Sequence, residues 1–85
     1  MFSVKLSNQS RNFIKRSERI VSQRIIKAIR TLQNNPTSKK AKRISSEVST
    51  YRLRVGDYRI LYDVYHEMKT VFIAKVDKRS RVYKK

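Results

Sequence analysis

The segment 51–65 constrains the fold most, because its alternation and its turn together determine which residues pair. Polar and apolar residues alternate on both sides of a central Gly56-Asp57 dipeptide. Alternation is typical of a strand with one buried face, and a two-residue Gly-Asp connection is typical of a β-hairpin. The segment therefore predicts an antiparallel hairpin in which Val55 lies opposite Tyr58.

The same register separates apolar residues from arginines. The residues predicted to share the apolar face are Tyr51, Leu53, Tyr58, Ile60 and Tyr62. On the other face Arg54 lies directly opposite Arg59, with Arg52 two residues along the strand. Like charges placed directly across a sheet are destabilising, by up to about 1 kcal/mol. One interpretation is a solvated strand face. The other is an anion site, because guanidinium groups match phosphate bidentately.

The N-terminal residues 2–16 are expected to form one strand followed by one helix. Residues 2–6 alternate between apolar and polar side chains, as in a strand with one buried face. Ser7 and Asn8 are candidate N-caps, and a helix is expected over residues 8–16.

A second helix is expected after Ser17 and Glu18, which suit an N-cap and an acidic first turn. Its apolar face is formed by Val21, Ile25, Ala28, Ile29 and Leu32. Pro36 ends this helix, because proline lacks an N–H donor and disfavours helical geometry in the preceding residue.

The remaining segments complete the expected layout. Residues 37–49 are predicted to be a basic loop, 66–69 a turn, 70–76 a third strand, rich in β-branched and aromatic residues, and 77–85 a charged tail. The order β-α-α-β-β-β predicts a single α+β domain over residues 1–85. Two N-terminal helices are expected to pack on one face of a mostly antiparallel, four-stranded sheet.

Charge and composition narrow the function classes. The net charge is +16 over 85 residues, which favours a polyanionic partner. The chain has no cysteine, one histidine and six scattered carboxylates, so neither a disulfide framework nor a metal site is expected. No cofactor is expected. Apolar runs are too short for a signal peptide or a membrane span, and the cytoplasm is the expected location.

Basic residues gather in two segments besides the hairpin. The candidate RNA-binding residues are Lys39, Lys40, Lys42, Arg43, Lys78 and Arg81. Tyr83 stands among the last of these, and an aromatic ring beside arginines is suited to stacking on an exposed base. A terminal basic tail without a function is the alternative for this segment.

Two stretches together resemble the RelE/ParE superfamily of toxins from toxin–antitoxin modules. They are Tyr-Arg-Leu-Arg-Val-Gly-Asp-Tyr-Arg-Ile-Leu-Tyr at 51–62 and Val-Asp-Lys-Arg-Ser-Arg-Val-Tyr at 76–83. The resemblance spans nearly the whole chain, including its length, its charge and its paired helices. It implies the fold of RelE and a toxin that inhibits translation by cutting mRNA in the ribosomal A site without a metal.

The resemblance also implies roles for particular residues. The residues matching the catalytic set are Arg52, Arg54, Arg59, Arg79 and Tyr83. The arginines would hold the scissile phosphate, and Tyr83 would stack on or position the cut nucleotide. One form of RelE has lysines at the positions of Arg52 and Arg54, and arginine is effectively never a base. Related toxins often have His at the position of Lys78, so the general base stays unassigned.

Other functions and the expected binding partners are considered next to the RelE-type activity. The ParE branch shares the fold and poisons DNA gyrase without nuclease activity, and a non-catalytic RNA- or DNA-binding module is the third possibility. Arg59, Arg79 and Tyr83 favour the RelE branch. The expected partners are a cognate antitoxin, the ribosome and mRNA, with no membrane. His66 falls in a predicted turn and is interpreted as a solvated residue rather than a base.

Overall fold

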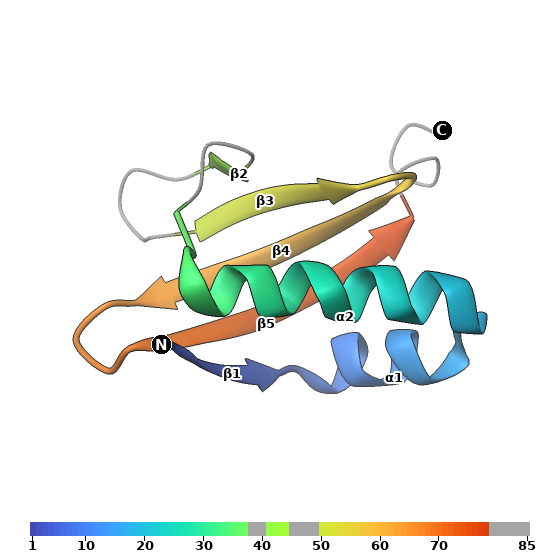
Figure 1. Ribbon diagram of the computed structural model, residues 1–85, viewed down its shortest axis with the longest axis horizontal. Helices are drawn as coiled ribbons and strands as arrows, with labels where there is room; N and C mark the ends of the chain where they lie inside the picture. The colour runs from blue at the N-terminus through green and yellow to red at the C-terminus, as the bar shows by residue number, and fades with distance from the viewer. Residues whose placement is uncertain (38–40, 45–49, 79–85) are drawn as a thin grey trace.

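The computed structural model describes residues 1–37, 41–44 and 50–78 (Figure 1). The elements in chain order are β1 (Ser3–Leu6), α1 (Asn8–Arg16), α2 (Arg19–Asn34), β2 (Ala41–Arg43), β3 (Thr50–Val55), β4 (Tyr58–Tyr65) and β5 (Thr70–Lys78). The α+β class and the layout of two helices on a mostly antiparallel sheet are confirmed. Within the described segments, no helix is long and apolar enough to span a membrane.

The sheet has one strand more than expected. In the described residues it has five strands, in the order β1-β5-β4-β3-β2, with β1 parallel to β5 and the other pairs antiparallel. The extra strand is β2, which lies in the segment expected to be entirely a basic loop, and there Lys42 pairs with Arg52. A three-residue strand gives too short a run of alternation to be recognised in sequence. Its pairing with β3 is a tertiary contact.

The hairpin register is confirmed throughout. Val55 lies opposite Tyr58, and the arginine pair Arg54 and Arg59 lie opposite each other. The turn places Gly56 at a φ of 60°, in the left-handed region that glycine enters at no steric cost.

The two helices begin and end near the expected residues. Ser7 is the N-cap of α1, and its side chain accepts a hydrogen bond from the Ser10 N–H at 3.1 Å. The N-cap of α2 is Glu18, without a side-chain cap, so the expectation for Ser17 was wrong. Ser17 instead ends α1, and its hydroxyl donates to the Phe13 carbonyl at 2.7 Å.

The core lies between the helices and one face of the sheet. The fully or nearly buried apolar residues are Ile25, Ile29, Leu32, Leu53, Ile60, Tyr62, Val64, Val71, Ile73 and Val76. Three of them come from the predicted apolar face of α2, and the others from β3, β4 and β5. Burying one face of the sheet in this way leaves the arginine-bearing face uncovered by helices.

A β-bulge changes which residues of β5 reach that uncovered face. Tyr62 lies opposite Ile73 while Leu61 lies opposite Lys75, so that Ala74 is the extra residue. Beyond the bulge Val76 points into the core and Lys75 and Asp77 point to the uncovered face.

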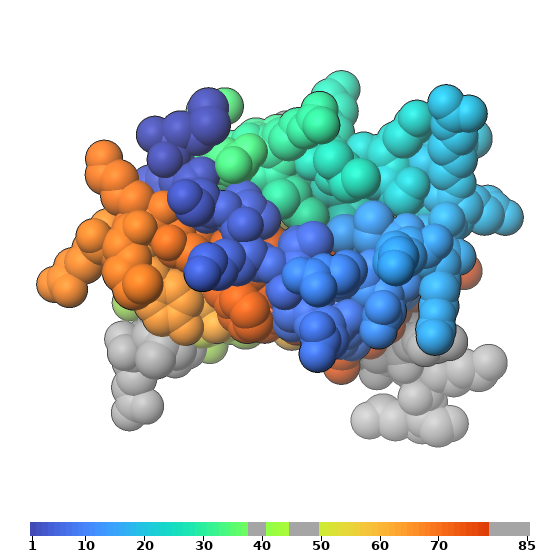
Figure 2. All heavy atoms as spheres, turned by 90° about the horizontal axis from the view of Figure 1, so that it is seen from below, coloured from blue at the N-terminus to red at the C-terminus, as the bar shows by residue number. Residues whose placement is uncertain are grey.

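α1 protects the edge of β5 beyond the end of β1. Figure 2 shows β1 and α1 in succession along this side of the molecule. The Ser7 hydroxyl donates to the Ala74 carbonyl, and the Ser10 hydroxyl donates to the Ile73 carbonyl. The Gln9 amide both donates to the Val76 carbonyl at 2.8 Å and accepts from the Val76 N–H at 3.0 Å. Polar side chains therefore take the place of a neighbouring strand.

Candidate nucleic-acid interface

The uncovered face of the sheet carries a cluster of cations centred on the hairpin. Arg54 and Arg59 lie directly opposite each other, and Arg52, two residues earlier on β3, lies opposite Leu61. Arg54 is exposed, whereas Arg52 and Arg59 are partly buried. We call the face formed by Arg52, Arg54 and Arg59 the arginine face.

Arg59 has a buried polar atom for which the described parts of the chain supply no hydrogen-bond partner. Its Nε is buried and has no hydrogen-bond partner among the residues that the structure describes. Asp77 lies directly opposite Arg59, but its Oδ2 pairs with Lys75 Nζ at 3.7 Å. A buried donor without a partner costs roughly 1–3 kcal/mol, and more in a charged group. An anion bound at the arginine face could supply the missing acceptor.

Two lysines extend the positive charge of this face. Lys42 is exposed and lies opposite Arg52, and Lys75 is exposed and lies opposite Leu61. Lys42 is among the predicted RNA-binding residues. Lys75 and Asp77 were not predicted to lie on this face. Strict alternation counted from Phe72 would place both side chains on the helix side, and the bulge at Ala74 reverses this.

The other predicted residues lie elsewhere. Arg43 is opposite Tyr51, which belongs to the helix-facing side of β3, and Lys78 is opposite Tyr58 at the end of β5. The predicted residues that lie outside the described parts of the chain are Lys39, Lys40, Arg79, Arg81 and Tyr83. The structure thus brings together Arg52, Arg54, Arg59 and Lys42.

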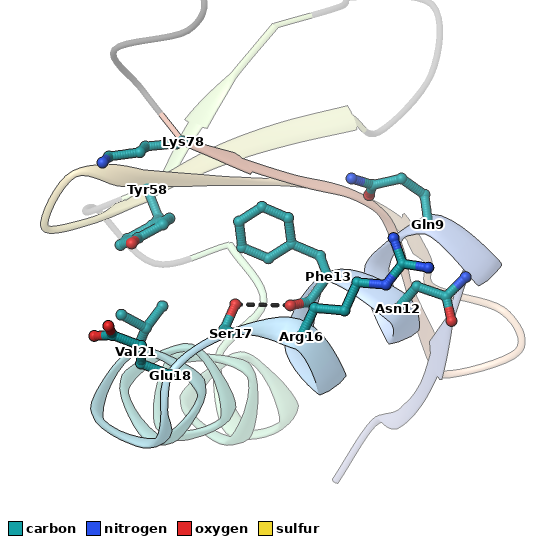
Figure 3. Close-up of a pocket in the computed structure, with 9 residues that line it drawn as sticks. All are labelled: Gln9, Asn12, Phe13, Arg16, Ser17, Glu18, Val21, Tyr58 and Lys78. Atoms are coloured by element: carbon teal, nitrogen blue, oxygen red, sulfur yellow. Dashed lines mark hydrogen bonds between the residues drawn. The ribbon is translucent and has the colours of Figure 1, made fainter.

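A cavity of about 680 Å³ lies between the α1–α2 turn and the end of the sheet (Figure 3). Phe13 and Tyr58 meet edge to face in its wall, with ring centroids 5.9 Å apart. Arg16 and Lys78 also line it, and Glu18 adds a carboxylate. The mixed charges and the aromatic wall favour no single ligand class, and the cavity faces the helix side rather than the arginine face.

The tyrosines divide between the two sides of the sheet. Tyr62 is fully buried, stacks on Tyr51 with centroids 5.6 Å apart, and donates to the Pro36 carbonyl. Burial, with a smaller contribution from Tyr51, raises the pKa of Tyr62 well above the ordinary tyrosine value. Tyr65 alternates to the arginine-face side and is 48% exposed. His66 is exposed in the turn after β4, as expected.

Comparison with known proteins connects this chain to toxins. The family model described as the ParE toxin of the type II toxin-antitoxin system, parDE, matches residues 4–83. A Methanocaldococcus jannaschii protein that carries the name RelE1 toxin is 34% identical over 59 residues, which are 66% of this chain and 66% of that protein.

Solved structures agree with the family match. The RelE of the archaeal RelE–RelB complex from Pyrococcus horikoshii OT3 superposes with a TM-score of 0.80 at 24% identity, covering 94% of this chain and 97% of that one. A chain of the RelBE2 toxin–antitoxin complex from Mycobacterium tuberculosis gives 0.77 at 26% identity, covering 92% and 98%. The chain belongs to the RelE/ParE toxin superfamily, within the family described as ParE toxin, and is the toxin of a type II toxin–antitoxin module with a RelE-like fold.

Proposed function

We propose that this toxin is a ribosome-dependent endoribonuclease that cleaves mRNA in the ribosomal A site and so inhibits translation. The observation that carries the proposal is the arginine face. There Arg59 lies across from Arg54 on an uncovered sheet surface, and its buried Nε has no hydrogen-bond partner among the described residues. Such a cluster is suited to a phosphate that bears developing negative charge.

The chemistry proposed is transesterification within the RNA. The 2′-hydroxyl attacks the adjacent phosphorus, the bond to the 5′ oxygen of the next nucleotide breaks, and a cyclic phosphate remains. Arg52, Arg54 and Arg59 hold the phosphate and stabilise its charge, and none of them serves as the base because guanidinium stays protonated. Arg79 and Tyr83, which match the family set, are assigned to the phosphate and to the cut nucleotide.

Metal independence and ribosome dependence belong to the same proposal. Among the described residues, no three His, Asp or Glu side chains gather where they could hold a metal ion. Catalysis would rest on orientation and electrostatics, with the ribosome orienting the mRNA. The site of action would then be the cytoplasm, and the partners would be the ribosome, mRNA and a cognate antitoxin. RelE is bound to RelB in the Pyrococcus horikoshii complex, which supports the last of these.

Purified protein added to translating ribosomes tests the proposal, with mRNA ends mapped by primer extension. New ends should appear on ribosome-bound mRNA, persist in chelator, and be scarce on the same RNA without ribosomes. Comparable cleavage of free and ribosome-bound mRNA would contradict ribosome dependence. Loss of cleavage in chelator, restored by added metal, would contradict metal independence.

Inhibition of DNA gyrase is the second candidate, and the match to the ParE family favours it. It predicts inhibited supercoiling and double-strand breaks in DNA, with no new mRNA ends. A supercoiling assay run beside the primer extension separates the two activities. If the protein binds nucleic acid but shows neither activity, a non-catalytic basic module becomes the better description.

A further inference from the structure

The proposed cleavage needs a group that accepts the proton of the attacking 2′-hydroxyl. Arg52, Arg54 and Arg59 cannot take it, because a guanidinium group stays protonated. The acceptor must lie within hydrogen-bond reach of that hydroxyl, and so beside the phosphate that the arginine face would hold. His66 does not meet this condition. It stands in the turn after β4, seven residues beyond Arg59, which corresponds to roughly 23 Å along an extended strand.

Asp77 places a carboxylate in the same row of the sheet as the central arginine pair. It lies directly opposite Arg59 on β5, and Arg54 lies opposite Arg59 on β3. Side chains directly opposite each other in an antiparallel pair have Cβ atoms roughly 4.5–5.5 Å apart. A phosphate bound by Arg59 would therefore have this carboxylate as an immediate neighbour.

The two oxygens of the Asp77 carboxylate have different surroundings. Oδ1 accepts a hydrogen bond from the Lys78 N–H at 2.8 Å, which orients the group. Oδ2 lies 3.7 Å from Lys75 Nζ, which is longer than the roughly 2.7–3.2 Å of a hydrogen bond. The side chain is 21% exposed. Asp77 thus presents an oriented carboxylate whose Oδ2 has room for a further hydrogen bond.

The other carboxylates of the described residues are less suitable. Glu18 lines the cavity on the helix side, and Asp57 and Glu67 stand in the turns on either side of β4. Asp63 shares the uncovered face, but it lies four residues along β4 from Arg59, and its Oδ1 accepts the Thr50 hydroxyl at 2.6 Å.

A negative charge beside a bound phosphate weakens its binding, since like charges repel. The chain has only six Asp and Glu residues against 22 Lys and Arg, and one of the six stands next to Arg59. A carboxylate in this place lowers affinity for the phosphate but can accept a proton from the bound nucleotide.

We propose that Asp77 is the general base of the cleavage. The inference rests on the proposed ribosome-dependent nuclease activity and names the proton acceptor that this activity requires. Oδ2 takes the proton of the 2′-hydroxyl while the 2′ oxygen bonds to phosphorus. The bond from phosphorus to the 5′ oxygen of the next nucleotide breaks, and that oxygen keeps the electron pair and takes a proton from water. The proton on Asp77 then passes to solvent, which restores the carboxylate.

Asp77→Asn separates a base from a charge that only repels, because the two roles predict opposite signs. Removal of a repelling charge would tighten RNA binding and leave cleavage as fast or faster. Removal of a general base should lower single-turnover cleavage on the ribosome by at least about 100-fold without weakening RNA binding. Asp63→Asn is the matched control, because it makes the same change on the same face and keeps an acceptor for Thr50. It should cleave at nearly the parental rate, and thermal melts confirm that both variants fold.

The pH dependence of cleavage distinguishes a base from a residue that only supports the structure. Without a base, hydroxide must remove the proton, so the logarithm of the Asp77→Asn rate should rise by about one for each pH unit, more steeply than in the parent. A supporting role would lower the rate equally at every pH. Formate should also restore part of the activity of Asp77→Ala, whereas chloride at the same concentration should not.

The outcomes separate this inference from the function on which it rests. Parental cleavage by Asp77→Asn, equal losses in Asp77→Asn and Asp63→Asn, or a pH profile parallel to that of the parent would overturn the assignment and leave the nuclease in place. A parent protein that produces no new mRNA ends on translating ribosomes would instead remove the proposed function, and the base with it.

Discussion

At the scale of single residues, Arg59 is the side chain whose environment most directly indicates a ligand. Three arginines share one face, but only Arg59 has a buried Nε without a partner in the described structure. Position therefore distinguishes this residue from the many other cations of the chain. A protein with a net charge of +16 loses little long-range attraction when one arginine is removed.

Removal of the Arg59 side chain should slow the chemical step. We expect Arg59→Ala to lower cleavage on the ribosome by at least about 100-fold, the order seen when one preorganised charge-stabilising donor is removed. Arg30→Ala, on the exposed side of α2, should change cleavage little. Single-turnover cleavage with saturating protein measures the effect. Similar shallow losses in both variants, in parallel with ribosome binding, would show that only bulk charge matters.

Tyr62 makes the second prediction at this scale, and it concerns stability. Its buried hydroxyl donates to the Pro36 carbonyl, which joins β4 to the chain after α2. Tyr62→Phe leaves that carbonyl without its partner, and should reduce the free energy of unfolding by about 1–3 kcal/mol. Urea titration measures the change, with Tyr65→Phe as the exposed control. An equal effect of the two variants would contradict the role of the buried bond.

The raised pKa of Tyr62 also predicts how stability depends on pH. Because burial favours the protonated phenol in the folded state, the folded protein holds this proton where the unfolded chain has lost it. Its contribution is complete below the ordinary tyrosine pKa of about 10 and falls as pH rises above it. As pH rises above about 10, the parent should therefore lose more stability than Tyr62→Phe. Parallel pH profiles of the two proteins would contradict this.

At the scale of elements, the edge of β5 depends on side chains of α1. β1 pairs with β5 only as far as Ile73, and beyond that point the Gln9 amide bonds both backbone polar groups of the buried Val76. This contact ties the helix to the strand that continues toward the predicted catalytic tail.

Loss of the Gln9 amide should loosen that edge. We expect Gln9→Ala to reduce the free energy of unfolding by about 1–3 kcal/mol, because two backbone groups lose their partners. Gln23→Ala on α2 is the control. Hydrogen exchange should increase at the Val76 amide before it increases at Val71, near the start of β5. Unchanged protection at Val76 would mean that water replaces the side chain without cost.

At the scale of the whole molecule, the net charge affects the strength of RNA binding more than it affects the rate of cleavage. Binding to single-stranded RNA should weaken linearly in a plot of log affinity against log salt, with a slope of about 0.7 for each phosphate neutralised. Arg52→Ala should reduce that slope by about one contact, and Arg30→Ala should leave it unchanged. Fluorescence anisotropy with a labelled oligonucleotide at several salt concentrations measures both slopes. Equal slopes for the two variants would contradict a defined RNA path over the arginine face.

Patterns of neighbouring residues in the sequence were sufficient to predict much of the fold and the central arginines of the candidate site. Alternation around Gly56-Asp57 predicted the register of β3 and β4, and with it the opposition of Arg54 and Arg59. Helical spacing predicted the buried face of α2. These features could be read from neighbours in the chain, because a two-residue turn leaves one register and a helix repeats every 3.6 residues.

Contacts between distant segments decided the rest. The strand β2 exists through its pairing with β3, and the bulge at Ala74 brings Lys75 and Asp77 to the arginine face. The sequence alone determined which residues alternate within β1, β3 and β4. Only the tertiary structure decided where that alternation shifts by one residue, because the bulge forms where β5 must pair with β4 while Val76 is buried under the helices.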